Sequence, residues 1–392
     1  MLYRKLGKTE LSVSILGFGA MRLPFAGGST SALDAFNPNK KIDEEETTKM
    51  IEFAVSRGVN YFDTAYVYHA GQSEVVLGKA LKPFRDKVFI ATKLPTMVVK
   101  EASDFERTFE EQLKRLDTGF VDVYLVHALN RPVWHKMKEL GMLRFLDRVQ
   151  ADGRARHIGI SFHDDVRIFK EIVDGYDWKL CQIQYNYYDE DTQAGKEGLL
   201  YAASKGLGVV VMEPIRGGRL ADPIPDEARA IWNSAGVKRT PGEWALRWVW
   251  NQAEVSTALS GMSTMNQVIE NIRIADEGKP NTLTPNELSL IQQARQVYRK
   301  MLKVDCTGCA YCMPCETGVN IPAVFSLYND LYASNAKEIA PVLYSITIPP
   351  GEQASACTEC LKCEEKCPQH IEIRDELKKA HELLYREGLL QH

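Results

Sequence analysis

Short apolar runs alternate with longer segments of helical period along most of the chain. Eight runs lie between residues 12 and 261, and each is apolar throughout instead of alternating with polar residues. Parallel strands that are covered on both faces have this pattern. The runs are SVSILGFG, GVNYFDTA, KVFIATK, FVDVYLVH, ARHIGIS, LCQIQYN, LGVVVMEP and VSTALSG.

The segments between these runs carry apolar residues three and four positions apart, which indicates amphipathic helices. Residues 45–58 follow this period, and Gly58 is expected to end the helix. In residues 103–119 we expect Ser103 to be the N-cap, with Glu106 three positions later completing a capping box.

Eight β–α alternations over about 250 residues favour a (β/α)8 TIM barrel of the α/β class. A doubly wound open sheet is the alternative, but LGFGAM after the first run lacks the third glycine of a dinucleotide-binding turn. Residues 24–42 predict a long loop on the catalytic face, either a mobile lid or a solvated loop. We expect the barrel to span residues 1–280 and a second, C-terminal domain to span 281–392.

Composition and charge narrow the class of protein. The formal net charge is −4, so no basic surface for nucleic acid is expected. No run of about 18 apolar residues predicts a membrane span, and the first residues do not resemble a signal peptide. These features favour a cytoplasmic globular protein.

The cysteines are concentrated near the C-terminus. The chain has nine, and eight of them lie between residues 306 and 367. Cys181 stands apart in an apolar run and is expected to be a small buried side chain. Because disulfides are disfavoured in the cytoplasm, the other eight predict metal ligation.

Two cysteine motifs predict iron–sulfur clusters. CTECLKCEEKCP has the C-x2-C-x2-C-x3-C-P spacing of bacterial ferredoxins, and CTGCAYCMPC supplies a second set. Zinc is the alternative, although overlapping C-x2-C units suit its four-ligand sites poorly. We predict two [4Fe–4S] clusters in a helical ferredoxin-like domain with crossed ligation. The first takes Cys306, Cys309, Cys312 and Cys367, and the second takes Cys357, Cys360, Cys363 and Cys315.

Polar residues stand at the ends of three successive apolar runs, where barrel enzymes hold their catalytic groups. They are Asp63, Lys93 and His127, and Tyr68 follows Asp63 by five positions. Carbonyl reduction needs a proton donor, and a tyrosine with a pKa of about 10 is a weak one. We expect the Lys93 ammonium to lower this pKa, Asp63 to hold Lys93, and His127 to orient the carbonyl oxygen.

These four residues resemble the Asp-Tyr-Lys-His tetrad of the aldo-keto reductase superfamily. The stretches YRKLGKTELSVSILGFGAMR, HIGIS, QIQYN and SGMS are also similar to that superfamily, over residues 1–280. The resemblance implies reversible hydride transfer between NAD(H) or NADP(H) and a small-molecule carbonyl or alcohol. It implies that Tyr68 is the general acid/base.

The resemblance also implies a cofactor site. Residues 161 and 184 would hold the nicotinamide carboxamide, and the loops after the last two strands would hold the pyrophosphate and the adenosine phosphate. The implied residues are Met21, Asp63, Ser161, Gln184, Met212, Pro214, Ile215, Arg216, Gly218, Gly261, Met262, Ser263, Gln267 and Asn271.

Several positions depart from the family pattern. Phe162 stands where Asn is usual, and Met212 stands where an aromatic residue stacks on the nicotinamide. Gly261 and Gln267 occupy places where many members carry Lys or Arg to bind the 2′-phosphate of NADP. The loss of such a cation argues against a strong NADP preference. NAD and a retuned pocket for another redox carrier both stay open.

Clusters transfer one electron at a time, whereas hydride transfer moves two. In one interpretation, the clusters exchange electrons with ferredoxin or a flavoprotein, and FMN in the barrel links the two kinds of chemistry. In a second, the clusters are structural in an NAD(P)H-dependent reductase. In a third, the protein is a non-catalytic electron-transfer subunit, but the intact tetrad counts against this interpretation.

Overall fold

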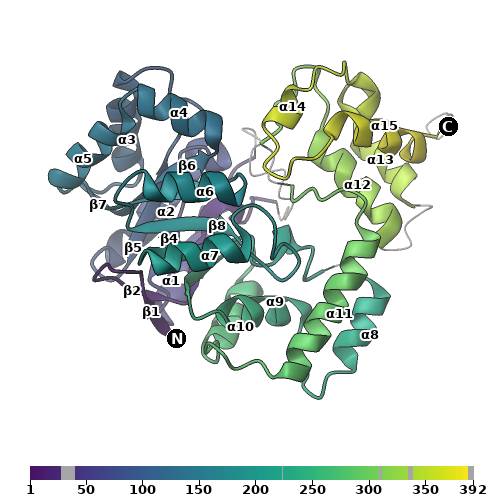
Figure 1. Ribbon diagram of the computed structural model, residues 1–392, viewed down its shortest axis with the longest axis horizontal. Coiled ribbons are helices and arrows are strands. Elements are labelled where there is room, and N and C mark those ends of the chain that lie inside the picture. The colour runs from purple at the N-terminus through teal and green to yellow at the C-terminus, as the bar shows by residue number, and fades with distance from the viewer. Residues whose placement is uncertain (28–39, 223, 309–310, 334–338, 387–392) are drawn as a thin grey trace. The chain divides into compact units, whose positions relative to one another are not determined.

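The computed structural model describes residues 1–27, 40–222, 224–308, 311–333 and 339–386 (Figure 1). The centre of the predicted loop at 24–42 and the predicted ligand Cys309 lie outside these residues. The chain forms two compact units, Met1–Pro214 with Ala245–Leu283 and Ile215–Trp244 with Thr284–His392. The domain boundary near residue 280 stays a prediction.

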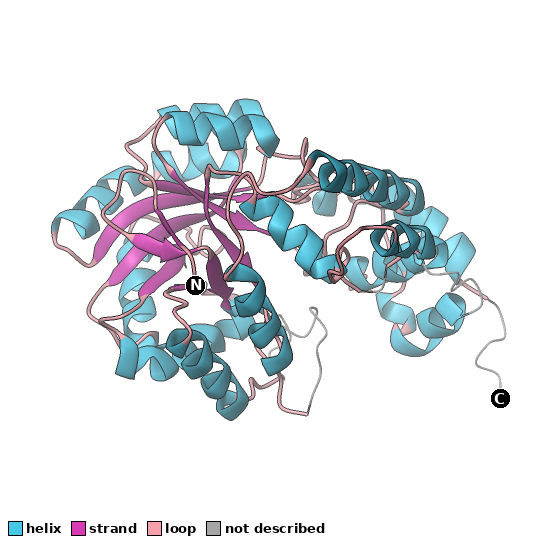
Figure 2. Cartoon of the chain, turned by 90° about the horizontal axis from the view of Figure 1, so that it is seen from below, coloured by secondary structure: helices cyan, strands magenta, loops and turns pink. Residues whose placement is uncertain are grey.

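Parallel strands close into an eight-stranded barrel in the order β10-β3-β4-β5-β6-β7-β8-β9 (Figure 2). The predicted (β/α)8 fold is therefore confirmed, and each predicted run supplies one barrel strand. The strands are β3 (Leu16–Gly19), β4 (Tyr61–Asp63), β5 (Phe89–Leu94), β6 (Val121–Leu129), β7 (Ala155–Phe162), β8 (Leu180–Gln184), β9 (Gly208–Met212) and β10 (Val255–Ser260).

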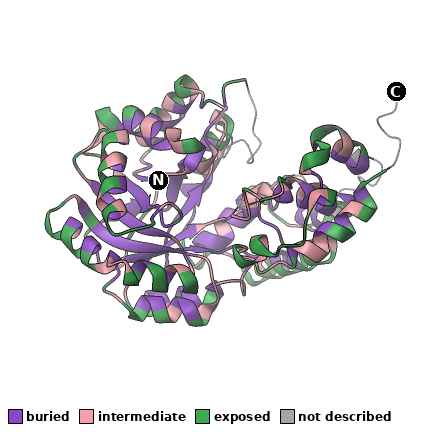
Figure 3. Cartoon of the chain, turned by 90° about the horizontal axis from the view of Figure 1, so that it is seen from above, coloured by how far each residue is buried: buried purple, intermediate pink, exposed green. Residues whose placement is uncertain are grey.

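Apolar side chains fill the interior of the barrel. Tyr61, Val123, Leu180 and Val210 are fully buried there and belong to one packed cluster. The barrel strands are buried along most of their length (Figure 3). A filled barrel has no central pore, so polar groups that act on a ligand must stand where the strands end.

The first predicted run divides into two strands, which is a correction. Its first half, β2 (Ser12–Ser14), pairs antiparallel with β1 (Tyr3–Lys5), and only the second half enters the barrel as β3. Side chains of this hairpin, Leu6 and Val13, are fully buried in the interior cluster. Gly7 has a φ of +59°, and a Cβ there would lie 2.2 Å from the backbone nitrogen of Gly208. The hairpin thus closes the end of the barrel where β9 begins.

Helices follow the barrel strands as the apolar period predicts. The capping box expected at Ser103 is wrong: the N-cap is Ala102, which has no side-chain cap, and the Ser103 hydroxyl donates to Glu101 at 2.5 Å. The helices are α1 (Glu44–Ser56), α2 (Gln72–Leu81), α3 (Ser103–Arg115), α4 (Arg131–Glu139), α5 (Met142–Ala151), α6 (Val166–Asp174), α7 (Gly195–Ser204), α9 (Pro241–Trp250) and α10 (Met265–Ala275).

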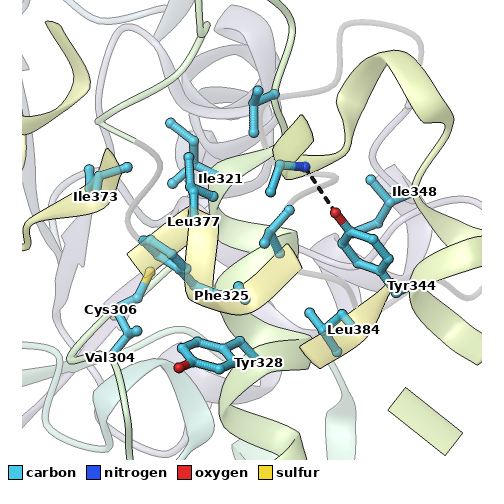
Figure 4. Packing of buried hydrophobic residues seen from close by; sticks show 14 of the residues in the cluster. Val304, Cys306, Ile321, Phe325, Tyr328, Tyr344, Ile348, Ile373, Leu377 and Leu384 are labelled. Atoms are coloured by element: carbon cyan, nitrogen blue, oxygen red, sulfur yellow. Dashed lines mark hydrogen bonds between the residues drawn. The ribbon is translucent and has the colours of Figure 1, made fainter. Parts of the chain in front are cut away.

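The second unit is helical. Phe325, Tyr344 and Leu377 lie in its buried core, and the Tyr344 hydroxyl accepts a hydrogen bond from the backbone N–H of Ala354 at 2.9 Å (Figure 4). No helix in the described part of the chain is long and apolar enough to cross a membrane. The helices are α8 (Asp226–Asn233), α11 (Pro285–Met301), α12 (Ile321–Ala333), α13 (Ile339–Thr347), α14 (Lys362–Glu365) and α15 (Ile373–Leu384).

Candidate active site and cluster sites

A buried ion pair links two adjacent strand ends. Lys93 on β5 donates to Asp63 Oδ1 on β4 at 2.5 Å and to the backbone carbonyl of Thr64 at 2.8 Å. Both charged side chains are almost completely buried. The parallel pairing of β4 with β5 aligns Asp63 with Ala91, two positions before Lys93, so the register itself brings the two groups together.

Tyr68 lies beside this pair at the start of the short 3-10 segment η3 (Tyr68–Gly71). The centroid of its ring is 4.9 Å from Lys93 Nζ and 5.9 Å from the ring of His127, which it meets edge-on at 83°. His69 and Ala70 have φ values of 51° and 52°, a backbone region that non-glycine residues rarely occupy. The structure therefore brings together all four residues of the predicted tetrad.

Burial controls the ionisation of the pair. It raises the pKa of Asp63 and lowers the pKa of Lys93, and the charge of each residue partly offsets the effect on the other. A buried ion pair of this kind is stable only while both partners are present.

Burial also raises the pKa of Tyr68 well above its ordinary value, and the charges of Asp63 and Glu213 act in the same direction. This is opposite to the expected effect of Lys93. Desolvation of the phenolate is the largest influence, and the Asp63 carboxylate balances the Lys93 ammonium. Tyr68 is therefore a neutral phenol at pH 7.

His127 is neutral for a similar reason. Burial lowers its pKa well below 6.5, and the nearby Lys93 and His163 act in the same direction. Burial likewise lowers the pKa of His163 to about 4. A neutral imidazole still carries one N–H donor, which can hydrogen-bond a carbonyl oxygen.

Three of the predicted cofactor residues stand at successive strand ends. Ser161 on β7 and Gln184 on β8 are buried, and Gln184 is aligned with Met212 on β9. Gln184 donates to Asp189 at 2.8 Å. On the same face of β8, Gln182 Oε1 is buried and has no hydrogen-bond partner among the described residues. Gln182 was missed in the sequence, although its i, i+2 spacing from Gln184 could have identified it.

The loop after β10 is internally hydrogen-bonded. The backbone N–H of Ser263 donates to Gln267 Oε1 at 2.7 Å, and Asn271 donates to the Ser260 hydroxyl at 2.9 Å. Thr264 caps α10. Residues 261–271 contain no lysine or arginine. The cation that would bind a 2′-phosphate is therefore absent from this stretch of sequence.

The remaining predicted cofactor residues do not all fall in the barrel unit. Met262 and Pro214 are buried in that unit, Met21 is half-buried on η1 (Ala20–Arg22), and a Cβ on Gly261 would lie 3.1 Å from the Arg22 side chain. The other three lie in the second unit, either just before or on η5 (Arg216–Gly218). They are Ile215, Arg216 and Gly218.

The thiols of the second unit are grouped. One cavity is lined by five of them, together with Arg374 and Leu377. Cys306 is buried, and its neighbour Cys367 acts to raise its pKa, after the larger effect of burial. Among the described side chains, no three cysteine, histidine or acidic groups converge on a single metal ion. The cavity-lining thiols are Cys312, Cys315, Cys357, Cys360 and Cys363.

Both cysteine sets use the same backbone turn. The N–H of Gly308 donates to Cys306 Sγ at 3.4 Å, and the N–H of Glu359 donates to Cys357 Sγ, also at 3.4 Å. Burial acts to raise the pKa of Cys315, but hydrogen bonds from the Thr317 hydroxyl and nearby backbone N–H groups outweigh it and lower the pKa. Hydrogen bonds to sulfur stabilise thiolates, the form that ligates iron.

Comparison with known proteins identifies the two parts of the chain. The sequence pattern of the aldo/keto reductase family matches residues 16–295. The chain belongs to the aldo/keto reductase family. In addition, residues 305–372 match the 4Fe-4S dicluster domain. This aldo/keto reductase therefore carries a ferredoxin-like domain after its barrel.

Relatives of this aldo/keto reductase include named oxidoreductases. It is 30% identical over 298 residues to L-galactose dehydrogenase of Arabidopsis thaliana, covering 70% of this chain and 88% of that protein. It is 26% identical over 311 residues to the NADH-specific methylglyoxal reductase of Escherichia coli, covering 68% and 91%. Among solved structures, the holo form of aldo-keto reductase AKR11C1 from Bacillus halodurans aligns with a TM-score of 0.62 at 26% identity, over 75% of this chain and 96% of that one. The protein is an oxidoreductase.

Proposed function

We propose that this aldo/keto reductase interconverts a small-molecule carbonyl and an alcohol by hydride transfer, with Tyr68 as the general acid/base. The observation that carries the proposal is the packing of the Tyr68 ring against the buried Lys93–Asp63 pair and beside neutral His127. An acid, a cation and a neutral hydrogen-bond donor thus gather in one buried place, as carbonyl reduction requires.

A bound NAD(H) or NADP(H) supplies or accepts the hydride. Side chains of the protein stabilise the negative charge that develops on the carbonyl oxygen and supply the proton. His127 donates a hydrogen bond to the carbonyl oxygen, where negative charge develops. The Tyr68 hydroxyl then gives its proton to the same oxygen, because a phenol is a stronger acid than an alcohol and burial raises the pKa of both groups. In the oxidation direction the Tyr68 phenolate removes that proton, and Lys93 stabilises the phenolate.

The strand ends fit a nicotinamide nucleotide. Ser161 and Gln184 are the proposed partners of the carboxamide, and Gln182 Oε1 is a buried acceptor still without a partner among the described residues. Asp63 Oδ2 is another such acceptor and suits a ribose hydroxyl. Buried polar atoms are normally hydrogen-bonded, so each of these two acceptors supports a polar ligand in the barrel.

The loop after β10 supports NAD over NADP. The N-terminus of α10 offers backbone N–H groups for a phosphate, as helix N-termini commonly do. Gln267 is engaged with Ser263 and has no positive charge to pair with a 2′-phosphate. The name of the Escherichia coli relative, an NADH-specific reductase, agrees with this preference.

The cysteine arrangement supports two [4Fe–4S] clusters with crossed ligation. Cys315 lines the same cavity as Cys357, Cys360 and Cys363, which Cys312 lines as well, and Cys306 is a neighbour of Cys367. The last cysteine of each motif therefore lies beside at least one cysteine of the other motif. This is the ligand exchange expected of two-cluster ferredoxins.

We also propose that the clusters exchange electrons with a partner such as ferredoxin or a flavoprotein. Cys360 is exposed, so a cluster there is accessible to another protein. FMN in the barrel is the proposed link between one-electron and two-electron chemistry, and the structural role of the clusters is the alternative. Free cysteine thiols suit the cytoplasm, where disulfides are disfavoured.

The test is anaerobic purification followed by iron and sulfide analysis, an absorption spectrum and identification of released cofactors. NADH-dependent reduction is then measured on a panel of small aldehydes and ketones, with Tyr68→Phe as the variant. We expect about eight iron atoms per chain and activity that depends on Tyr68. A preparation without iron rejects the clusters, and full activity of Tyr68→Phe rejects its role.

A further inference from the structure

The backbone segment that precedes Cys306 is hydrogen-bonded to helix α12. Asn329 on that helix is fully buried, and its Oδ1 accepts hydrogen bonds from the backbone N–H groups of Lys303 and Val304, both at 3.0 Å. Its Nδ2 donates to the carbonyl of Val304 at 2.7 Å. The segment that carries Cys306 is therefore held rigidly, and groups beside it keep fixed distances from its sulfur.

A buried arginine holds the other side of this segment. Arg216 on η5 has no exposed surface, and its guanidinium donates to the carbonyl oxygen of Asp305 at 3.2 Å and to Asp305 Oδ1 at 3.3 Å. Asp305 directly precedes Cys306 in the chain. The Asp305 side chain is 61% exposed, so water screens its negative charge, whereas the charge of Arg216 is shielded from water.

A second cation follows in the same turn. The backbone N–H of Arg219 donates to the carbonyl of Arg216 at 3.1 Å, and the Arg219 side chain is half-buried. The Arg219 and Arg216 guanidinium groups both lie close enough to the Cys306 sulfur to interact with it electrostatically. Asp330 faces Arg219, and burial raises the pKa of this carboxyl. Two guanidinium groups thus lie near Cys306.

The other cysteine set has no buried cation among the described residues of its cavity. Lys362, Lys366 and Arg374 line that cavity, but all three are more than a third exposed. Lys362 pairs with Glu316 at 2.6 Å, and Arg374 pairs with Asp375 at 2.7 Å. Exposed, paired charges of this kind are screened by water and salt. The two cluster sites therefore differ in how far their cations are buried.

We propose that Arg216 and Arg219 hold the reduction potential of the cluster bound by Cys306 above that of the cluster bound by Cys357, Cys360 and Cys363. Reduction adds one negative charge to a [4Fe–4S] cluster, and a buried cation stabilises the reduced form more than the oxidised form. An electron that enters at the exposed set then moves to the Cys306 cluster and rests there. The inference rests on the proposed two-cluster arrangement.

The test is a redox titration of the anaerobically purified full-length protein with dithionite, followed by electron paramagnetic resonance. We expect two signals, and Arg219→Gln lowers the midpoint potential of the higher-potential one. The expected effect is about tenfold in the ratio of reduced to oxidised cluster at a fixed potential, which is about 59 mV for one electron. Arg219→Lys keeps the charge and restores most of the potential.

Arg229→Gln is the matched control, because Arg229 is an exposed arginine of the same unit that pairs with Asp226 on α8. It leaves both potentials unchanged. A shift confined to the lower-potential signal, or no shift with Arg219→Gln, overturns the inference. Iron analysis of the same samples separates this failure from failure of the proposed function, because a protein with fewer than two clusters contradicts the latter.

Discussion

The Lys93 ammonium lies 4.9 Å from the centre of the Tyr68 ring while it donates to Asp63 at 2.5 Å. The Lys93 ammonium therefore has two interactions: it neutralises the Asp63 carboxylate, and it contacts the ring of Tyr68, the proposed proton donor. The phenol stays protonated because desolvation raises its pKa, and the cation is present to stabilise the phenolate once the proton has left.

Tyr68→Phe is expected to reduce kcat for carbonyl reduction by about 10²–10⁴, the usual contribution of a positioned acid. The ring remains, so packing against Lys93 and His127 is kept and binding of NADH stays near the wild-type value. Steady-state kinetics with NADH and fluorescence titration of the cofactor measure the two quantities.

Tyr66→Phe is the matched control for that variant. Tyr66 lies in the same loop, but its hydroxyl donates to Glu111 at 2.8 Å. We expect its removal to leave kcat within about twofold of wild type, since loss of one part-buried hydrogen bond has a small effect. Equal losses in the two variants would mean that the loop, and not the Tyr68 hydroxyl, controls the rate.

Lys93→Met is expected to destabilise the barrel by about 3–5 kcal/mol, because it leaves the buried Asp63 carboxylate without its cation. The double variant Asp63→Asn with Lys93→Met removes both charges and recovers a large part of this loss. Urea unfolding followed by circular dichroism measures the free energies of unfolding. Additive effects of the two substitutions contradict a coupled pair.

Part of this site follows from the sequence alone. The eight apolar runs identify the barrel strands, and Asp63, Lys93 and His127 are recognisable because each ends one of them. Their meeting depends only on parallel register, which the fold class implies. Tyr68 follows Asp63 by only five positions, so it stays near the ion pair, and its role is what the resemblance implies.

Other features depend on contacts that local sequence does not encode. The first apolar run, SVSILGFG, divides at Ile15 into β2 and β3. It divides because β1 is available to pair with its first half. Arg216 is expected from the resemblance to belong to the cofactor site, and the sequence gives no sign that its guanidinium bonds Asp305, 89 residues away. A contact between residues so far apart in the sequence is determined by the packing of the second unit. No periodic pattern in the sequence predicts it.

The stability of the barrel is expected to fall below about pH 6.5 because histidines are buried in the neutral form. Burial lowers the pKa of His69 to about 4, and its Nε2 accepts a hydrogen bond from the backbone N–H of Leu23 at 3.2 Å. The unfolded chain takes up the proton first, so the contribution is complete above pH 6.5 and is lost as pH falls toward 4. His69 alone accounts for about 2 kcal/mol between pH 7 and pH 5.

His69→Gln can keep an acceptor for Leu23 and removes this titration, so its unfolding free energy changes less between pH 7 and pH 5 than that of wild type. His135→Gln is the control, since His135 is exposed on α4. If the pH dependence of His69→Gln equals that of wild type, the buried neutral histidine does not contribute. Urea unfolding at the two pH values provides the measurement.

The preference for NADH or NADPH is expected to depend on the charge of the side chain at position 267. Gln267→Arg places a guanidinium at the start of α10 and should raise the ratio of kcat/KM for NADPH to that for NADH by about tenfold, because arginine binds phosphate in a bidentate manner. Gln267→Glu keeps an acceptor for the Ser263 N–H but adds a negative charge, so the ratio falls. The two variants share their position and differ in charge. If both shift the ratio in the same direction, charge at this position is not the cause.

Crossed ligation of the clusters can be tested by measuring the number of iron atoms per chain in cysteine variants. If Cys315 shares a cluster with Cys357, the double variant Cys315→Ala with Cys357→Ala loses one cluster, and iron falls from about eight to about four atoms per chain. Cys312→Ala with Cys357→Ala removes ligands from both clusters, and iron falls further. If ligation is uncrossed, the double variant Cys315→Ala with Cys357→Ala loses both clusters instead of one.

Cys181→Ala is the control for these variants, because Cys181 is buried in barrel strand β8 and burial raises the pKa of its thiol. Its iron content is expected to equal that of wild type. The visible absorption of the clusters gives an independent count on the same samples. A double variant at Cys315 and Cys357 that loses all its iron, beside a Cys181 variant that keeps it, decides for uncrossed ligation.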